Sequence, residues 1–128
     1  MTNVSTQIFV ESRYKVSRKK IKTRVEEVIL SRGITTPVEV SIAIVGDRKM
    51  TSLNKKYRNL DKTTNVLSFS QSEGENMVVS TDKLVLGDVV ISYPVMIQEA
   101  SKENMLVDDK ICFWVQHGLS HLLGEHHE

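Results

Sequence analysis

The stretch His117-Gly-Leu-Ser-His-Leu-Leu-Gly-Glu-His-His-Glu128 holds all four histidines of the chain. His117 and His121 are four residues apart, so on a helix they lie on one face, about 6 Å apart along the axis. Two imidazoles at that spacing can bind one metal ion. Gly124 follows three residues later, where a glycine can adopt a positive φ and end the helix. The stretch therefore predicts a helix that ends in a metal site.

A third metal ligand can come from the residues after this turn. The chain can bend back there and offer either His126 or His127. Three histidines with an open fourth position are typical of a catalytic zinc site, so we expect one zinc ion per chain. The spacing from His117 to His127 also matches H-x-x-x-H-x-x-G-x-x-H, the histidine framework of the metzincin proteases. Those proteases need a glutamate base directly after the first histidine, and Gly118 at that position argues against their mechanism.

Two further blocks of sequence lie upstream of the histidines. They are Leu53-Asn-Lys-Lys-Tyr-Arg58 followed by Thr64-Asn-Val-Leu-Ser-Phe69, and Leu86-Gly-Asp-Val-Val-Ile-Ser92. With the histidine block they resemble the YbeY-like metal-dependent endoribonucleases, in that family's order and over roughly the last two-thirds of the chain. The family signature is H-G-x-L-H-L-x-G-Y-D-H, and the matching residues are His117, Gly118, His121, Leu122, Gly124 and His127. The departures are Ser120, Glu125 and His126.

The resemblance implies a zinc-dependent endoribonuclease that cuts single-stranded RNA and acts in ribosomal RNA maturation. The expected partners are ribosomal RNA or its precursor and a ribosomal subunit. His117, His121 and His127 would hold the zinc ion, since the family spacing favours His127 over His126. Arg58 would face the metal cleft and neutralise transition-state charge, because a guanidinium can bond two phosphate oxygens at once. The catalytic residues we expect are Arg58, His117 and His121, and the identity of the general base stays open.

Basic residues crowd the start of a predicted helix that Ser17 caps and that runs to about Ser31. Cations at a helix N-terminus oppose the helix dipole and destabilise the helix slightly, so this grouping is unusual. They can form a solvated face, or they can contact RNA phosphates. The nucleic-acid-binding residues we expect are Arg18, Lys19, Lys22 and Arg58.

The order of the remaining elements predicts the fold class. We expect strands at 7–10, 38–45, 64–69 and 84–92, and helices at about 17–31, 47–57, 93–103 and 110–123. Asp47 is expected to cap the second helix, and Asp108 or Asp109 the last. Gly87 predicts a bulge or a close backbone approach. Two helix-linked strand pairs suggest βαβ crossovers, followed by a hairpin-like pair. The prediction is an α+β (α/β-like) fold, and the resemblance implies a small mixed four-stranded sheet packed with helices.

Length and composition favour one domain spanning residues 1–128. The net charge of +1 gives no global argument for nucleic acid, so that argument depends on local charge. No apolar run approaches the roughly 20 residues that span a bilayer, and the N-terminus lacks the pattern of a signal peptide. The single cysteine, Cys112, lies in an apolar run and is expected to be buried. We expect a cytoplasmic protein that does not bind membranes.

Two other functions are compatible with the same residues. One is a zinc hydrolase that acts on another ester or amide, and assays of peptides and nucleotides beside RNA would distinguish it. The other is a ribosome-associated RNA-binding protein with a structural metal. Chelation would unfold such a protein, whereas a catalytic site would lose activity and keep its fold.

Overall fold

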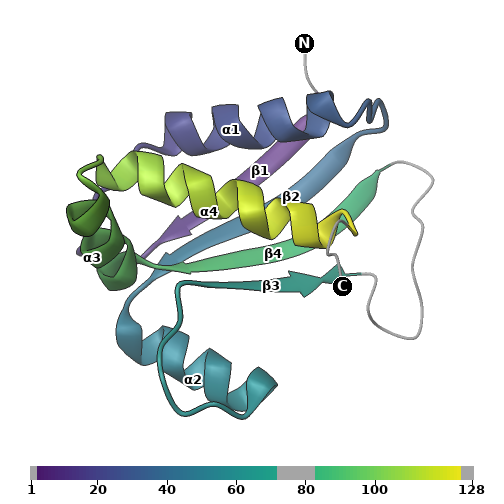
Figure 1. The fold of residues 1–128 in the computed structure, drawn as a ribbon. Helices are drawn as coiled ribbons and strands as arrows, with labels where there is room; N and C mark the ends of the chain where they lie inside the picture. Colours follow the sequence, from purple (N-terminus) through teal and green to yellow (C-terminus); the bar gives the residue numbers. More distant parts are fainter. Residues whose placement is uncertain (1–2, 72–82, 125–128) are drawn as a thin grey trace.

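The computed structural model describes residues 3–71 and 83–124, and within them four strands form one mixed sheet (Figure 1). The strands are β1 (Val4–Val10), β2 (Val38–Val45), β3 (Val66–Ser70) and β4 (Leu84–Ser92). Their spatial order is β1-β2-β4-β3. β1, β2 and β4 are parallel, and β3 is antiparallel to β4. The predicted α+β fold with a small mixed four-stranded sheet is confirmed.

The strand connections confirm one of the two predicted crossovers. α1 (Arg18–Ser31) links β1 to β2, and these strands are parallel, as a βαβ unit requires. The crossover predicted from β2 through α2 (Asp47–Arg58) to β3 is wrong. β3 runs antiparallel to β4 and therefore opposite to β2, and it forms the predicted hairpin-like pair with β4. Hydrophobic periodicity shows where a strand lies and not its direction, which explains the error.

Helices lie on both faces of the sheet (Figure 1). α1 and α4 (Val107–Leu122) cover one face, and α3 (Tyr93–Glu103) lies at one end of α4. The larger core fills the space between them and the sheet, and it includes Val25, Ile42, Ile91, Val115 and Leu119. α2 covers the opposite face over a smaller core of Val45, Met50, Leu67 and Val90. Side chains alternate between the two faces along each strand, so β2 and β4 contribute to both cores.

Two of the predicted helix caps are wrong, and the aspartates tie distant segments together instead. Gly46 is the N-cap of α2, and Asp47 is its first helical residue. Oδ1 of Asp47 accepts a hydrogen bond from the hydroxyl of Ser92, at 3.2 Å. Neither predicted aspartate caps α4, and Oδ1 of Asp108 accepts a hydrogen bond from the backbone N–H of Ser17, at 3.1 Å. A carboxylate in a first turn still complements the helix dipole while it makes these tertiary bonds.

Two expectations drawn from composition can be compared with the structure. Within residues 3–71 and 83–124, no helix is long and apolar enough to cross a membrane. Cys112 is buried in the larger core as a free thiol, as predicted. Burial raises the pKa of this thiol, so it stays protonated and behaves as a small hydrophobic residue. The assignment of residues 1–128 to one domain stays a prediction.

β4 contains the irregularity predicted at Gly87. The pairing between β2 and β4 shifts beside Val40, which is the sign of a β-bulge. Gly87 has a φ of +134°, a region that is essentially restricted to glycine. A Cβ added at this position would collide with the carbonyl oxygen of Phe69 on the neighbouring β3. The observed pairing of β3 with β4 therefore requires a glycine at position 87.

Replacing Gly87 with alanine should lower the free energy of unfolding by about 3 kcal/mol, because it adds both backbone strain and a clash with Phe69. Gly33→Ala is the matched control, since Gly33 also has a positive φ but has open space around it. It should cost about 1 kcal/mol. Urea denaturation of both variants measures the difference, and equal losses would contradict the proposed clash.

Candidate active site

α4 carries two histidines beside each other at the surface. Ile111, Val115 and Leu119 of this helix are buried in the larger core, which fixes the helix on the sheet. The imidazole rings of His117 and His121 lie on the same side of the helix, with centroids 4.6 Å apart. The prediction that the two histidines share one helix face is confirmed.

Gly118 lets α4 lie directly on β3 and β4. A Cβ added to this glycine would lie 2.7 Å from Cγ1 of Val89 and 3.0 Å from the hydroxyl oxygen of Ser68, closer than real side chains allow. The Ser68 hydroxyl donates a hydrogen bond to the carbonyl oxygen of Gly118, at 3.3 Å. In the sequence, Gly118 matches the family signature and stands where a metzincin protease has its glutamate base, but nothing there indicates a packing role. In the structure, the small size of Gly118 lets α4 approach β3 closely, so that His117 lies beside this strand.

The histidines open into a cleft of about 490 Å³ that three separate segments surround. These segments are the end of α2, the chain that leads into β3, and α4. The lining residues are Arg58, Thr64, Asn65, Val66, Leu67, Ser68, Trp114, His117 and His121. The three residues predicted to act in catalysis, Arg58, His117 and His121, therefore lie in one cleft although 63 positions separate the first from the last.

The histidine pair is suited to bind a metal ion. The pKa of His117 is lowered, first by burial and then by the positive charge of His121. A lowered pKa keeps the imidazole neutral, and only the neutral ring can donate a nitrogen lone pair to a metal. His127, the predicted third ligand, lies outside the described residues, as does His126. Within residues 3–71 and 83–124 no three side chains form a metal-binding group, so the three-histidine site stays a prediction.

The predicted nucleic-acid-binding residues of α1 lie away from this cleft. α1 and α4 run side by side, and Lys20 near the start of α1 forms an ion pair with Asp109 near the start of α4. Asp109 and His121 are 12 residues apart, which is about 18 Å along a helix. The residues concerned are Arg18, Lys19 and Lys22. Arg18 also donates a hydrogen bond to the carbonyl oxygen of Ile8, at 2.6 Å. A role for these three residues in RNA binding stays a prediction.

A carboxylate of α3 joins two walls of the cleft. Oε1 of Glu99 accepts a hydrogen bond from the indole N–H of Trp114, at 2.7 Å. Oε2 accepts one from the side-chain amide of Asn65, at 3.2 Å. Lys110, which is only 5% exposed, lies 3.8 Å from Oε1 and thus offsets the charge of this carboxylate. The Trp114 ring in turn packs edge-on against His117, with centroids 4.9 Å apart.

Sequence reasoning missed this network. Asn65 lies in one of the blocks that carry the family resemblance, but the block was interpreted only as a strand. Trp114 lies in the same apolar run as Cys112, which gives no sign of a polar partner. Glu99 and Lys110 lie on different helices and carry no local signal, so nothing in the sequence indicates that they meet.

Comparison with known proteins adds to this geometry. The family model described as Endoribonuclease YbeY matches residues 5–128. The Endoribonuclease YbeY of Syntrophus aciditrophicus is 36% identical over 118 residues, which cover 92% of this chain and 72% of the relative. The one from Acinetobacter baumannii is 35% identical over 122 residues, 95% of this chain and 77% of the relative. The solution structure of TM1509 from Thermotoga maritima is similar with a TM-score of 0.62 and 25% identity, over 96% and 75% of the two chains.

Glu99→Ala should disturb the cleft, because both Trp114 and Asn65 lose their acceptor. We expect the free energy of unfolding to fall by about 1–3 kcal/mol and the emission of Trp114, the single tryptophan, to change. Glu103→Ala is the matched control, since Glu103 contacts Lys110 at 2.8 Å from the same helix and bonds to neither wall. Its emission should equal that of the wild type. Equal emission changes in both variants would contradict a specific role of Glu99.

The His117 ring should titrate below 6.5, the ordinary value for histidine, in zinc-free protein followed by NMR. Replacing His121 with alanine should raise the pKa of His117, because a neighbouring positive charge is removed. The pKa should still stay below 6.5, since burial is the larger cause. A lowered pKa also means that protons compete less with a metal, so metal binding should persist to lower pH. A pKa of His117 above 6.5 would contradict desolvation as the main cause of the shift.

Proposed function

Because the chain belongs to the YbeY endoribonuclease family, we propose that it is a metal-dependent enzyme that cuts single-stranded RNA during ribosomal RNA maturation. The observation that carries the proposal is the cleft in which Arg58 joins the histidine pair of α4. A cation and a pair of metal-binding imidazoles in one cleft suit a phosphodiester substrate, which is an anion at every step of its hydrolysis.

The ligands proposed for the metal are His117, His121 and His127, and zinc is the metal that imidazole ligands favour. When bound, zinc acts as a Lewis acid that polarises a phosphoryl oxygen and lowers the pKa of water. The lowered pKa of His117 fits this role, because it leaves the ring neutral and able to act as a ligand. Edge-on packing against Trp114 restricts the rotation of the same ring.

Arg58 is proposed to bind the scissile phosphate. Its side chain is exposed at the end of α2 and forms no hydrogen bond or ion pair with any residue in the described part of the chain. The guanidinium is therefore free to form two parallel hydrogen bonds with phosphate oxygens and to offset the charge that develops on them. No carboxylate is among the lining residues described for the cleft, so we assign no residue to the transfer of the proton.

The substrate and the location of the protein follow from the same proposal. We propose ribosomal RNA or its precursor as the substrate, bound within a ribosomal particle. The family's link to ribosomal RNA maturation supports this choice. We also propose that the protein acts in the cytoplasm, where a free thiol such as that of Cys112 stays reduced.

The test combines metal content, RNA cleavage and circular dichroism on wild-type protein, chelator-treated protein and His121→Ala. Wild-type protein should hold about one zinc per chain and cut single-stranded RNA. The other two samples should lose metal and cleavage but keep their fold, because the larger core forms without either histidine. Full cleavage by metal-free His121→Ala would refute the mechanism. Unfolding on chelation would favour an RNA-binding protein with a structural metal.

Arg58→Ala is the companion variant in the same experiment. It should keep its zinc, because it leaves the histidines in place, and its kcat should fall by about 10²–10³-fold, the usual effect of removing one group that stabilises transition-state charge. Loss of zinc from this variant would mean that Arg58 supports the metal site instead of binding the phosphate.

A further inference from the structure

We infer that the outer face of α2 binds the backbone of single-stranded RNA and leads the strand into the histidine cleft. This inference rests on the proposed function and adds to it a surface for the substrate outside the cleft. The surface consists of four exposed cations of α2, and we call it the α2 basic face. Its members are Arg48, Lys49, Lys55 and Lys56.

The helical spacing of α2 separates these cations from the protein core. At 100° per residue, the four positions fall on one side of the helix, opposite the buried Met50 and Asn54. Arg58 follows Lys55 by three residues and lies about 60° from it around the helix, at the edge of this side, where it lines the cleft. Arg48 and Arg58 are ten residues apart, or about 15 Å along the axis. A chain of phosphates can therefore follow the helix and arrive at the histidines.

The cations of the α2 basic face are not neutralised by neighbouring acids. Asp47 is the single acidic residue of α2, and none of the four cations forms an ion pair with a residue in the described ranges. Nζ of Lys56 lies 5.1 Å from the centroid of the Tyr57 ring. Cations without acidic partners can neutralise phosphates without first breaking an ion pair, and each phosphate contact releases counterions that are condensed on the nucleic acid.

Two cations at the start of α1 have hydrogen-bond or ion-pair partners in the described part of the chain, unlike the four cations of the α2 basic face. Lys20 pairs with Asp109, and Arg18 donates to a backbone carbonyl. These residues also lie near the first turn of α4, whereas the histidines lie in its second half. Of these two groups of cations, the α2 basic face is thus the one that leads to the cleft.

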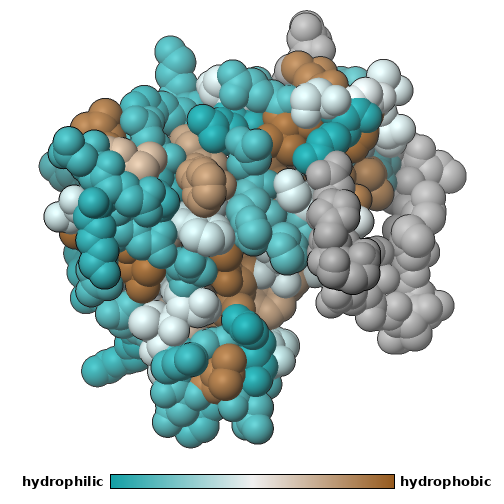
Figure 2. Space-filling model, viewed as in Figure 1, coloured by the Kyte–Doolittle hydropathy of each residue, from teal (hydrophilic) through white to brown (hydrophobic). Residues whose placement is uncertain are grey.

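Figure 2 shows the surface of α2, at the bottom of the view, as mostly hydrophilic around a small hydrophobic patch.

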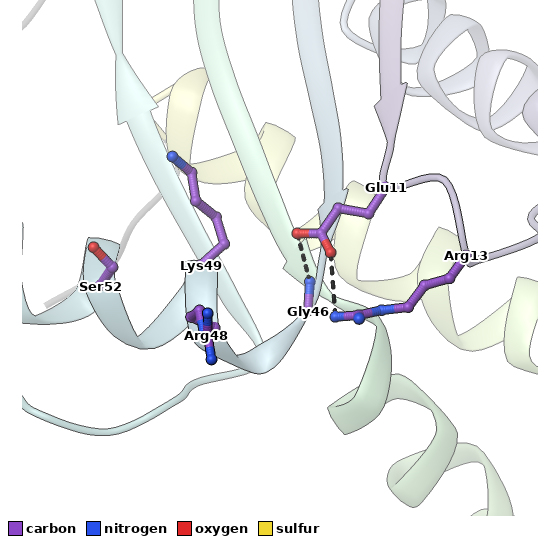
Figure 3. A pocket seen from close by; sticks show the side chains of 6 residues that line it. All are labelled: Glu11, Arg13, Gly46, Arg48, Lys49 and Ser52. Atoms are coloured by element: carbon purple, nitrogen blue, oxygen red, sulfur yellow. Dashed lines mark hydrogen bonds and ion pairs between the residues drawn. The ribbon is translucent and has the colours of Figure 1, made fainter.

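A second hollow extends the α2 basic face beyond the first turn of the helix. It has a volume of about 540 Å³, and its lining includes three cations, Arg13, Arg48 and Lys49, and one carboxylate, that of Glu11. Arg13 points toward Glu11, whereas the side chains of Arg48 and Lys49 point away from it (Figure 3). Glu11 is already occupied, because its Oε2 accepts a hydrogen bond from the backbone N–H of Gly46, at 3.0 Å, and its Oε1 lies 3.5 Å from Arg13. The hollow therefore keeps an excess of positive charge that suits another phosphate of the same strand.

Tyr57 gives a reason to expect a single strand. This residue is 55% exposed and lies between Lys56 and Arg58, at the end of the helix that meets the cleft. It packs against Phe69, with ring centroids 4.9 Å apart, which holds the ring in place. An aromatic ring next to a row of cations is the combination with which proteins bind single strands, because unpaired bases can stack on it. The bases of a duplex are already stacked and paired.

The test compares two double variants that each remove two exposed lysines. Lys55→Gln/Lys56→Gln changes the α2 basic face, and Lys19→Gln/Lys22→Gln changes α1. Zinc-loaded protein is titrated into labelled single-stranded RNA, and fluorescence anisotropy is read before cleavage shortens the strand. The α2 variant should bind about tenfold more weakly at 0.15 M salt, and its slope of log K against log salt should be lower by about 1.4, or about 0.7 for each lost phosphate contact.

The α1 variant tests the competing surface predicted from the sequence. Its affinity should fall by clearly less than that of the α2 variant, since Lys19 and Lys22 lie away from the cleft. In cleavage assays the α2 variant should raise KM and leave kcat nearly unchanged, because backbone contacts are made equally before and during the reaction. Wild-type affinity in the α2 variant, or equal losses in both variants, would overturn the inference. Absence of RNA cleavage by the wild type would instead count against the proposed function, and the binding comparison would still be informative.

Tyr57 is tested with a pair of variants that differ in stacking. Tyr57→Phe keeps an aromatic ring, and Tyr57→Leu keeps an apolar contact with Phe69 but removes the stacking surface. The leucine variant should lose about tenfold in affinity for single-stranded RNA, and the phenylalanine variant should match the wild type. Equal affinities of the two variants would overturn the role of Tyr57 in the inferred surface.

Discussion

The close packing of α4 on β3 and β4 is the constraint on which the candidate site depends. Gly118 leaves no space between the helix and the side chains of Val89 and Ser68. The helix therefore meets the sheet at one fixed height, and His117 and His121 stand at a fixed distance above the β3 edge. Functional side chains work best when the surrounding scaffold holds them in place. Gly118 provides that positioning because it has no side chain. Its low helix propensity makes α4 slightly less stable in return.

The rest of the cleft is built from parts that are distant in sequence. Glu99 of α3 bonds to Asn65 before β3 and to Trp114 of α4, and Lys110 balances its charge. A partly buried carboxylate would be costly without such partners. With them, it fixes the angle between the chain leading into β3 and the helix of the histidines. Two walls of the cleft are thus held by hydrogen bonds to Glu99, a residue that does not itself line the cleft.

Periodicity and turn chemistry in the sequence were enough to predict the helices, the strands and the face that His117 and His121 share, because these features depend on neighbouring residues. The family resemblance added Arg58, which the structure places in the same cleft. The antiparallel direction of β3 was not predictable, since a strand has the same periodicity in either direction. Asp47 was misread as a cap, because its acceptor role toward Ser92 depends on a contact across 45 residues. The Glu99 network was missed for the same reason.

The two halves of the site are attached to the sheet by cores of unequal size. α4 is held by the larger core, and α2, which carries Arg58, is held by the smaller core of Val45, Met50, Leu67 and Val90. Elements with few buried contacts open locally at free energies below that of global unfolding. On warming, α2 is therefore the element that should detach first, taking the arginine with it while the histidines remain in place. The upper temperature limit of the enzyme would then reflect the docking of one peripheral helix and not the melting of the domain.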